Sequence, residues 1–149
     1  GMPSARGTTH LVAIGNNSGR GDEVTLQYAE RDAARFAEVM RQVNNPAVRV
    51  NWDIMHPVRG EFATMRESFD ILRPYIAHLH VHDGEAGSGP LLPIGQGVVD
   101  HRAAIECLLA INYQGYISGE WIGWEPYEVH LPRELAALKG YEAAALARA

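Results

Sequence analysis

Histidines occupy every second position of residues 78–82, within the run IAHLHVHD at residues 76–83. Side chains alternate between the two faces of a β-strand, so this run predicts a strand with Ala77, Leu79 and Val81 on an apolar face and a row of imidazoles on the other. Neutral imidazole is the commonest metal ligand among side chains, and it titrates close to neutrality. The row therefore indicates metal or acid–base chemistry, although any one of these histidines alone is explained as well by a hydrogen-bonded core position.

Acidic residues end two other predicted strands. Asp53 is the last residue of the run over 48–53, and Glu120 is the last residue of the run over 116–120. His80 lies near the end of the histidine-bearing strand. Because functional sites of parallel α/β folds are built at the carboxyl ends of strands, we expect these three side chains to converge at one rim. Such a donor set suits Mn²⁺, Zn²⁺, Co²⁺ or Mg²⁺, whereas each carboxylate alone is explained equally well by a helix cap or an ion pair.

The sequence alternates four predicted strands with four predicted helices. Short apolar or alternating runs predict the strands, and apolar residues three or four positions apart predict the helices. The strands span residues 10–14, 48–53, 76–83 and 116–120, and the helices span 26–43, 62–72, 101–111 and a last segment with Pro132 in its first turn. This order implies a parallel sheet with right-handed crossovers. We therefore predict an α/β fold in which residues 1–149 form one domain of four βα units, a half TIM barrel with outer helices.

Further expectations concern individual helices and the loops between them. Asp100 is expected to cap the helix over 101–111, and His56 is expected to lie in a loop. The second helix is expected to bury Phe62, Met65, Phe69 and Leu72, and the last helix Leu135, Leu138, Tyr141 and Ala145. His10 and His130 belong to no motif and are expected at the surface.

Two loops have compositions that favour binding. The loop over residues 84–99 contains Gly95 and Gly97, whose backbone N–H groups suit a phosphate, although glycines in a loop often serve only to turn the chain. The loop after residue 120 carries Trp121, Trp124 and Tyr127. These aromatic residues suit either a wall on which a sugar stacks or an apolar patch that meets another subunit.

The composition excludes several broad classes of protein. The 149 residues carry a formal net charge of −5, which argues against general nucleic-acid binding. No apolar run approaches the roughly 20 residues that span a bilayer, and no secretory signal peptide is visible. The single cysteine, Cys107, allows no internal disulfide and is expected to be a buried thiol. These features favour a cytoplasmic protein.

Four motifs carry a resemblance to a known family. The runs VNWDIMH at 50–56, IAHLHVHD at 76–83, PIGQGVVD at 93–100 and GYISGE at 115–120 resemble, in order and spacing, the second half of the xylose isomerase-like TIM barrels. That family includes sugar-phosphate isomerases and epimerases. The resemblance covers residues from about 10 to 145.

The resemblance implies a metal-dependent reaction on a small carbohydrate. It implies Asp53, His80 and Glu120 as ligands of a divalent metal and His56 as a contact to the substrate. Independently of the resemblance, the sugar-stacking alternative for the aromatic loop would make Trp121 and Trp124 substrate contacts as well. Glu120 would also act as an acid and base that moves a proton next to a metal-polarised carbonyl.

The sequence departs from the family at one ligand. The family's first ligand is a glutamate, and the matching position here is Gly15, although Asp22 or Glu23 could supply a carboxylate from the next loop. A non-catalytic half-barrel that serves binding or assembly is therefore the alternative function, and turnover stays open between the two. The family's endonuclease branch is disfavoured, because its additional Asp-x-His ligands correspond to Gly89 and Leu91.

A half-barrel has consequences for assembly. Four parallel strands leave two open sheet edges and an inner face without a partner, which are liabilities in water. Pairing of two copies around a two-fold axis is the simplest remedy, so we expect a homodimer or higher homo-oligomer. A separate polypeptide that supplies the missing strands is the rival explanation.

Overall fold

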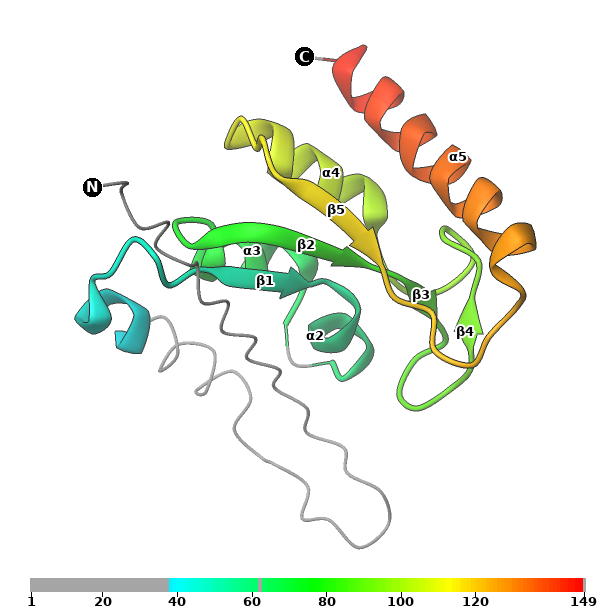
Figure 1. The fold of residues 1–149 in the computed structure, drawn as a ribbon, viewed down its shortest axis with the longest axis horizontal. Coiled ribbons are helices and arrows are strands. Elements are labelled where there is room, and N and C mark those ends of the chain that lie inside the picture. Colours follow the sequence, from blue (N-terminus) through cyan, green and yellow to red (C-terminus); the bar gives the residue numbers. More distant parts are fainter. Residues whose placement is uncertain (1–37, 62, 149) are drawn as a thin grey trace, which may run out of the picture.

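The computed structural model describes residues 38–61 and 63–148 of the chain (Figure 1). The predicted strand over 10–14 and most of the predicted helix over 26–43 lie outside these residues, as do His10, Gly15, Asp22 and Glu23. Residues 38–43, at the end of that helix, are helical.

A three-stranded parallel sheet forms the centre of the described part. Its strands are β1 (Val50–Asp53), β2 (Ile76–Val81) and β5 (Tyr116–Gly119), in the order β1-β2-β5. The register pairs Asp53 with His80 and Val81 with Gly119. The chain is therefore an α/β protein with a small parallel sheet and outer helices, a partial TIM barrel, as the sequence predicted at this level.

The core lies between one face of the sheet and the helices α3 (Met65–Leu72) and α4 (His101–Ala110), which run behind the sheet in Figure 1. Leu79 and Val81 of β2 point into this core and are almost fully buried. Burial of such side chains contributes about 1.5–3 kcal/mol each. The predicted alternation is confirmed for residues 78–81, because His78 and His80 occupy the intervening positions and are only half-buried. Ala77, which was expected on the apolar face, is exposed.

The second predicted helix begins later than expected. Thr64 caps α3 through its side chain, which accepts a hydrogen bond from the N–H of Glu67, and the Glu67 carboxylate accepts one from the N–H of Thr64. This capping box fixes the start of the helix at Met65. Phe62, which was expected on this helix, lies outside the described residues. Asp100 caps α4 as predicted, since its carboxylate accepts from the N–H of Ala103 at 3.0 Å.

The placement of His56 in a loop was wrong. Residues Met55–Arg59 form the short helix α2, with Pro57 in its first turn. Proline is tolerated there because the N–H groups of a first turn have no partner within the helix. The carboxylate of Asp53 accepts a hydrogen bond from the N–H of Met55 at 3.1 Å and so joins the end of β1 to the start of α2.

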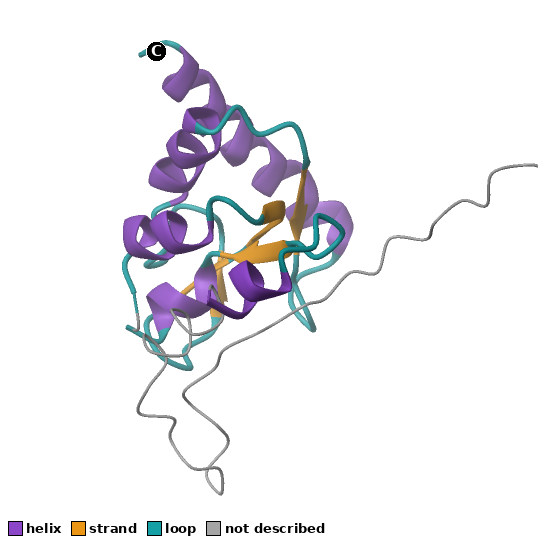
Figure 2. Cartoon of the chain, turned by 90° about the vertical axis from the view of Figure 1, so that its left-hand side faces the viewer, coloured by secondary structure: helices purple, strands orange, loops and turns teal. Residues whose placement is uncertain are grey.

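The last helix, α5 (Tyr127–Leu146), begins five residues before Pro132, so the placement of that proline in its first turn was wrong. The first turn forms after Pro126, whose carbonyl accepts hydrogen bonds from Val129 and His130. Leu135, expected inward, is 53 % exposed, because α5 packs mainly against α4 and lacks cover along this face. Figure 2 shows the C-terminal end of α5 projecting beyond the sheet.

The loop over residues 84–99 contains a short antiparallel pair, β3 (Asp83–Gly84) with β4 (Leu91–Leu92). The fully buried carboxylate of Asp83 accepts hydrogen bonds from the backbone N–H groups of Gly84, Gly95, Gly97 and Val99. The interpretation of Gly95 and Gly97 as a phosphate cradle was therefore wrong, because a side chain of the same protein already occupies their donors. A Cβ atom at position 97 would collide with this carboxylate.

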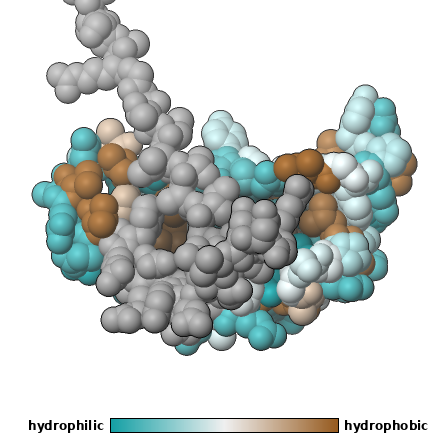
Figure 3. Space-filling model, turned by 90° about the horizontal axis from the view of Figure 1, so that it is seen from below, coloured by the Kyte–Doolittle hydropathy of each residue, from teal (hydrophilic) through white to brown (hydrophobic). Residues whose placement is uncertain are grey.

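The surface of the described part is mixed. Figure 3 shows apolar atoms at the exterior beside hydrophilic ones on the face seen from below. Ile122 and Tyr116 are the most exposed large apolar residues, at 81 % and 83 %. In the part of the chain that the structure describes, no helix combines the length and the apolarity needed to cross a bilayer.

Candidate metal centre

Three neighbouring strand ends bring a carboxylate, an imidazole and a second carboxylate together. Asp53 is the last residue of β1, His80 lies opposite it on β2, and Glu120 directly follows β5. The backbone holds these ends in place, since the N–H of Glu120 donates to the carbonyl of Val81 at 3.4 Å. The convergence expected from the sequence is therefore present in the structure.

The distances between these donors fit a single divalent ion. His80 Nδ1 lies 3.9 Å from Asp53 Oδ2 and 3.5 Å from Glu120 Oε2, and one donor atom from each residue lies within 4.8 Å of the others. Two ligands that are each about 2.1 Å from one ion lie roughly 3–4.2 Å apart. The side chains are 12 %, 28 % and 38 % exposed for Asp53, His80 and Glu120, so solvent reaches the donor set. The residues present therefore fit a small, hard or borderline cation.

The two oxygens of Asp53 have different surroundings. Oδ1 accepts hydrogen bonds from the N–H of Met55 at 3.1 Å and from His82 Nε2 at 3.0 Å. Oδ2 instead faces His56 Nε2 at 3.6 Å and His80 Nδ1 at 3.9 Å. The protein thus holds one oxygen by hydrogen bonds and leaves the other directed at the neighbouring donors.

His82 is a site residue that the sequence did not single out. It follows β2 directly, is 4 % exposed, and contacts the backbone carbonyl of Glu120 through Nδ1 at 3.0 Å as well as Asp53 through Nε2. With Asp53 and His56 it forms a second group of potential ligands within 4.8 Å of one another. Its place as the third histidine of the alternating run was the available signal.

Burial and charge act in opposite directions on Asp53 and His82. Burial lowers the pKa of His82, but the hydrogen bond and the charge of Asp53 outweigh it, so the pKa is raised above its ordinary value. Burial raises the pKa of Asp53, but the hydrogen bond to His82 and the charges of His82 and His56 lower it overall. Without a cation, the two residues therefore favour an ion pair.

His56 lies beside the same carboxylate. It is on α2, its side chain is 33 % exposed, and its ring meets that of His82 edge-on with centroids 5.7 Å apart. The structure thus places His56 beside Asp53 Oδ2, with part of its ring open to solvent.

Trp121 and Trp124 pack against each other and against His130. Their rings are stacked with centroids 6.4 Å apart, and they lie 4.8 Å and 5.3 Å from the ring of His130. The expected surface position of His130 was wrong, since this residue is only 5 % exposed. The indoles of Trp121 and Trp124 cover it. The guanidinium of Arg133 lies 5.2 Å from the ring of Trp124.

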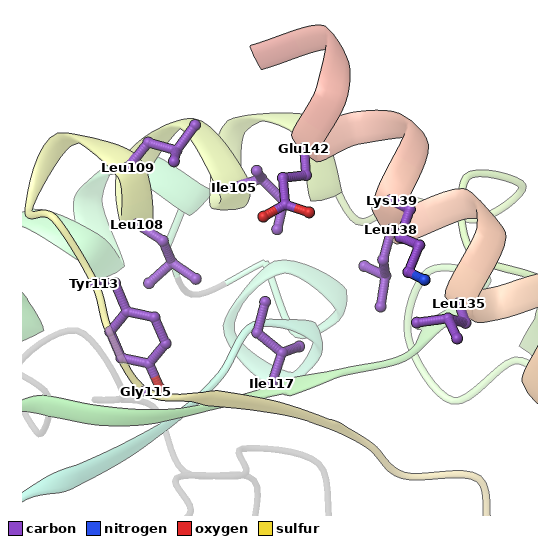
Figure 4. Close-up of a pocket in the computed structure, with 10 residues that line it drawn as sticks. All are labelled: Ile105, Leu108, Leu109, Tyr113, Gly115, Ile117, Leu135, Leu138, Lys139 and Glu142. Carbon is purple, nitrogen blue, oxygen red and sulfur yellow. The ribbon is translucent and has the colours of Figure 1, made fainter. Parts of the chain in front are cut away.

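An apolar hollow lies between β5, α4 and α5 (Figure 4). Its volume is about 290 Å³, and Leu108, Ile117 and Leu138 line it, with Lys139 and Glu142 on α5. None of Asp53, His80 and Glu120 lines this hollow. It is therefore distinct from the metal centre.

Comparison with known proteins agrees with this architecture. The family model described as xylose isomerase-like TIM barrel matches residues 15–144. No curated protein sequence matches the chain significantly.

Solved structures with the same fold include three of particular interest. A D-tagatose 3-epimerase-like protein superposes with a TM-score of 0.65 at 21% identity, over 78% of this chain and 42% of its own. A xylose isomerase-like TIM barrel protein from Mycobacterium smegmatis, in complex with magnesium, gives 0.60 at 24% identity, over 78% and 40%. The IOLI protein with a binding zinc atom gives 0.51 at 21% identity, over 76% and 43%. The chain thus spans less than half of each of these structures, and the likeness concerns the fold.

Proposed function

Because the chain belongs to the xylose isomerase-like TIM barrel family, we propose that Asp53, His80 and Glu120 bind a divalent cation for an isomerase or epimerase reaction on a small sugar or sugar phosphate. The observation that carries this proposal is the approach of one donor atom from each of these residues to within 4.8 Å of the others. Mn²⁺, Zn²⁺, Co²⁺ and Mg²⁺ suit the donor set. Magnesium and zinc are the metals named for two of the structures of the same fold.

The proposed chemistry is a proton transfer next to a carbonyl. The bound cation would polarise the carbonyl oxygen and so make the adjacent C–H group more acidic. Glu120 is 38 % exposed and presents Oε2 to His80, which leaves its second oxygen to take the proton from one carbon and return it. In this proposal His56 would donate a hydrogen bond to a substrate oxygen, and Trp121 and Trp124 would offer aromatic surface to the sugar.

A second candidate function is a barrel module that binds but does not catalyse. Gly15 favours it, because the family's glutamate at this position would supply a further ligand and the partner base of an epimerisation. The two functions differ in proton exchange, and they share the cation site.

We also propose that further strands cover the open edge of the sheet in the working protein. Among the described strands, β5 pairs only with β2, and its residues Tyr116 and Ile117 are 83 % and 40 % exposed. A second copy of the chain is the partner that we propose for this edge.

Metal analysis and a matched pair of variants test the cation site. Purified protein reconstituted with Co²⁺ is expected to hold about one ion per chain. Asp53→Asn removes a ligand charge and is expected to weaken Co²⁺ binding by 100-fold or more by calorimetry, because a neutral amide is a far weaker ligand. Asp70→Asn is the control, since Asp70 is exposed and faces Arg66 at 3.5 Å. Equal affinity of the two variants would contradict the site.

Proton exchange then separates the two functions. The Co²⁺-loaded protein is incubated with a panel of ketoses and aldoses in D₂O, and deuterium at the carbon next to the carbonyl is followed by NMR. Incorporation that Glu120→Gln abolishes supports the isomerase. Cation binding without any incorporation supports the non-catalytic module.

A further inference from the structure

His82 joins two of the three proposed cation ligands. Its Nε2 lies 3.0 Å from Oδ1 of Asp53, and its Nδ1 lies 3.0 Å from the backbone carbonyl of Glu120. These contacts reach the strands on both sides of β2, since Asp53 ends β1 and Glu120 follows β5. One imidazole therefore spans the rim of the sheet beneath the donors.

His82 is buried and held by its neighbours in the fold. The side chain is only 5 % exposed, and the backbone carbonyl of His82 accepts from His101 Nε2 at 3.2 Å. The next residue, Asp83, is fully buried and is held by four backbone N–H groups. A ring fixed in this way can hold its two partners at a constant separation.

The contact with Asp53 also selects the oxygen that remains for a cation. Oδ1 is saturated by His82 and by the N–H of Met55, so Oδ2 is the oxygen directed at His80. A rotation of the carboxylate would break both hydrogen bonds. Hydrogen bonds that orient a ligand in this way change metal affinity by about 10–100-fold when they are removed.

We propose that His82 is a positioning residue for the cation, which orients Asp53 and fixes the backbone of Glu120 without itself ligating the ion. The inference rests on the proposed function only in requiring that Asp53, His80 and Glu120 bind a cation. It adds a role for a histidine that the ligand set leaves out.

Two conservative variants separate the two contacts. The side-chain nitrogen of glutamine reaches about as far from the backbone as Nε2 of histidine, and that of asparagine about as far as Nδ1. His82→Gln is therefore expected to keep the hydrogen bond to Asp53, and His82→Asn to keep the one to Glu120. His82→Leu keeps neither. His130→Gln is the matched control, because His130 is 5 % exposed and faces tryptophans instead of the proposed ligands.

The experiment titrates the full chain with Co²⁺ and records calorimetric affinity and the visible absorption of the bound ion. We expect His82→Leu and His82→Asn to bind 10–100-fold more weakly than the wild type, and His82→Gln within about threefold. At saturation all three are expected to show the wild-type absorption bands, because the ligands are unchanged. His130→Gln is expected to lower the melting temperature but not the affinity, which separates positioning from general stability.

Three outcomes would overturn the inference. Wild-type affinity in both His82→Leu and His82→Asn refutes positioning while leaving the cation site intact. Loss of binding in His82→Gln together with altered absorption bands at saturation identifies His82 as a direct ligand instead. Absence of Co²⁺ binding by the wild type refutes this inference and the proposed function together.

Discussion

At the scale of single residues, the sequence predicts those side chains of the site that lie at the ends of strands. Asp53, His80 and Glu120 were placed together from the spacing of short apolar runs, because parallel strands end at one edge. His82 was missed because its importance lies in two hydrogen bonds across strands, which the spacing does not encode. His130 was misplaced because the indoles that cover it belong to the preceding loop, whose path depends on tertiary packing.

The stability of the protein without a cation is expected to depend on pH through Asp53 and His82. The pKa of His82 is raised above 6.5, so its contribution is complete below pH 6.5 and is lost as the pH rises through the raised value. The pKa of Asp53 is lowered below 3.8, so its contribution is complete above pH 3.8 and is lost as the pH falls through the lowered value. The ion pair is therefore expected to stabilise most strongly between these limits.

Melting temperatures in the presence of a chelator check this expectation. The difference between the wild type and His82→Gln isolates the imidazole, because all other titrating groups are shared. This difference is expected to be largest between pH 4 and 6.5 and to shrink at higher pH. A difference that grows steadily as the pH rises above 6.5 would show that the pKa of His82 is not raised.

At the scale of elements, the strands were easier to predict than the ends of helices. The alternating burial of β2 follows directly from the sequence, and this pattern was enough to predict the strand. The start of α3 depends on the capping box of Thr64 and Glu67, and α5 begins before a proline that the pattern had placed in its first turn. The apolar spacing therefore predicted that these helices form, whereas local hydrogen bonds decide at which residue each one begins.

Removal of the cap of α3 is expected to cost stability without affecting the site. Thr64→Ala removes the side-chain acceptor for the N–H of Glu67 and is expected to lower the free energy of unfolding by about 1 kcal/mol in urea denaturation. Thr64→Ser keeps a hydroxyl and serves as the control. A loss as large in the serine variant would show that the methyl group, and not the cap, stabilises this turn.

Two glycines are expected to respond in opposite directions to alanine. Gly97→Ala places a methyl group against the carboxylate of Asp83 and the carbonyl of Gly84, so we expect a loss of about 1–3 kcal/mol. Gly140→Ala lies in α5 with open space around it, so we expect a gain of roughly 0.5–1 kcal/mol. Urea denaturation measures both, and similar values for the two would contradict the close packing of residue 97.

At the scale of the whole molecule, the sequence predicted the class of fold because strand–helix alternation allows few topologies. The expected first strand, over residues 10–14, and Gly15 lie outside the described residues, so the count of four βα units stays a prediction. What covers the exposed edge of β5 depends on contacts beyond this sheet, and no pattern within the chain encodes them.

Self-association is the expected consequence of that edge. Light scattering coupled to gel filtration is expected to give at least twice the mass of 16.4 kDa at micromolar concentration. Tyr116→Lys places a charge on β5 and is expected to shift the protein toward the monomer, because Tyr116 is 83 % exposed and a charge at an edge strand opposes pairing. A wild-type protein that elutes as a stable monomer would contradict closure by a second copy.

The three proposed ligands differ in exposure, and this difference suggests the order in which a cation would meet them. Glu120 is 38 % exposed, His80 28 % and Asp53 12 %, so an ion that enters from solvent would meet the carboxylate of Glu120 before that of Asp53. Release of a bound ion would take the reverse order, with the more exposed Glu120 giving up the ion first, because Asp53 Oδ1 is held by Met55 and His82. Changes at Glu120 are therefore expected to alter how quickly ions come and go, and changes at Asp53 to decide whether one is held at all.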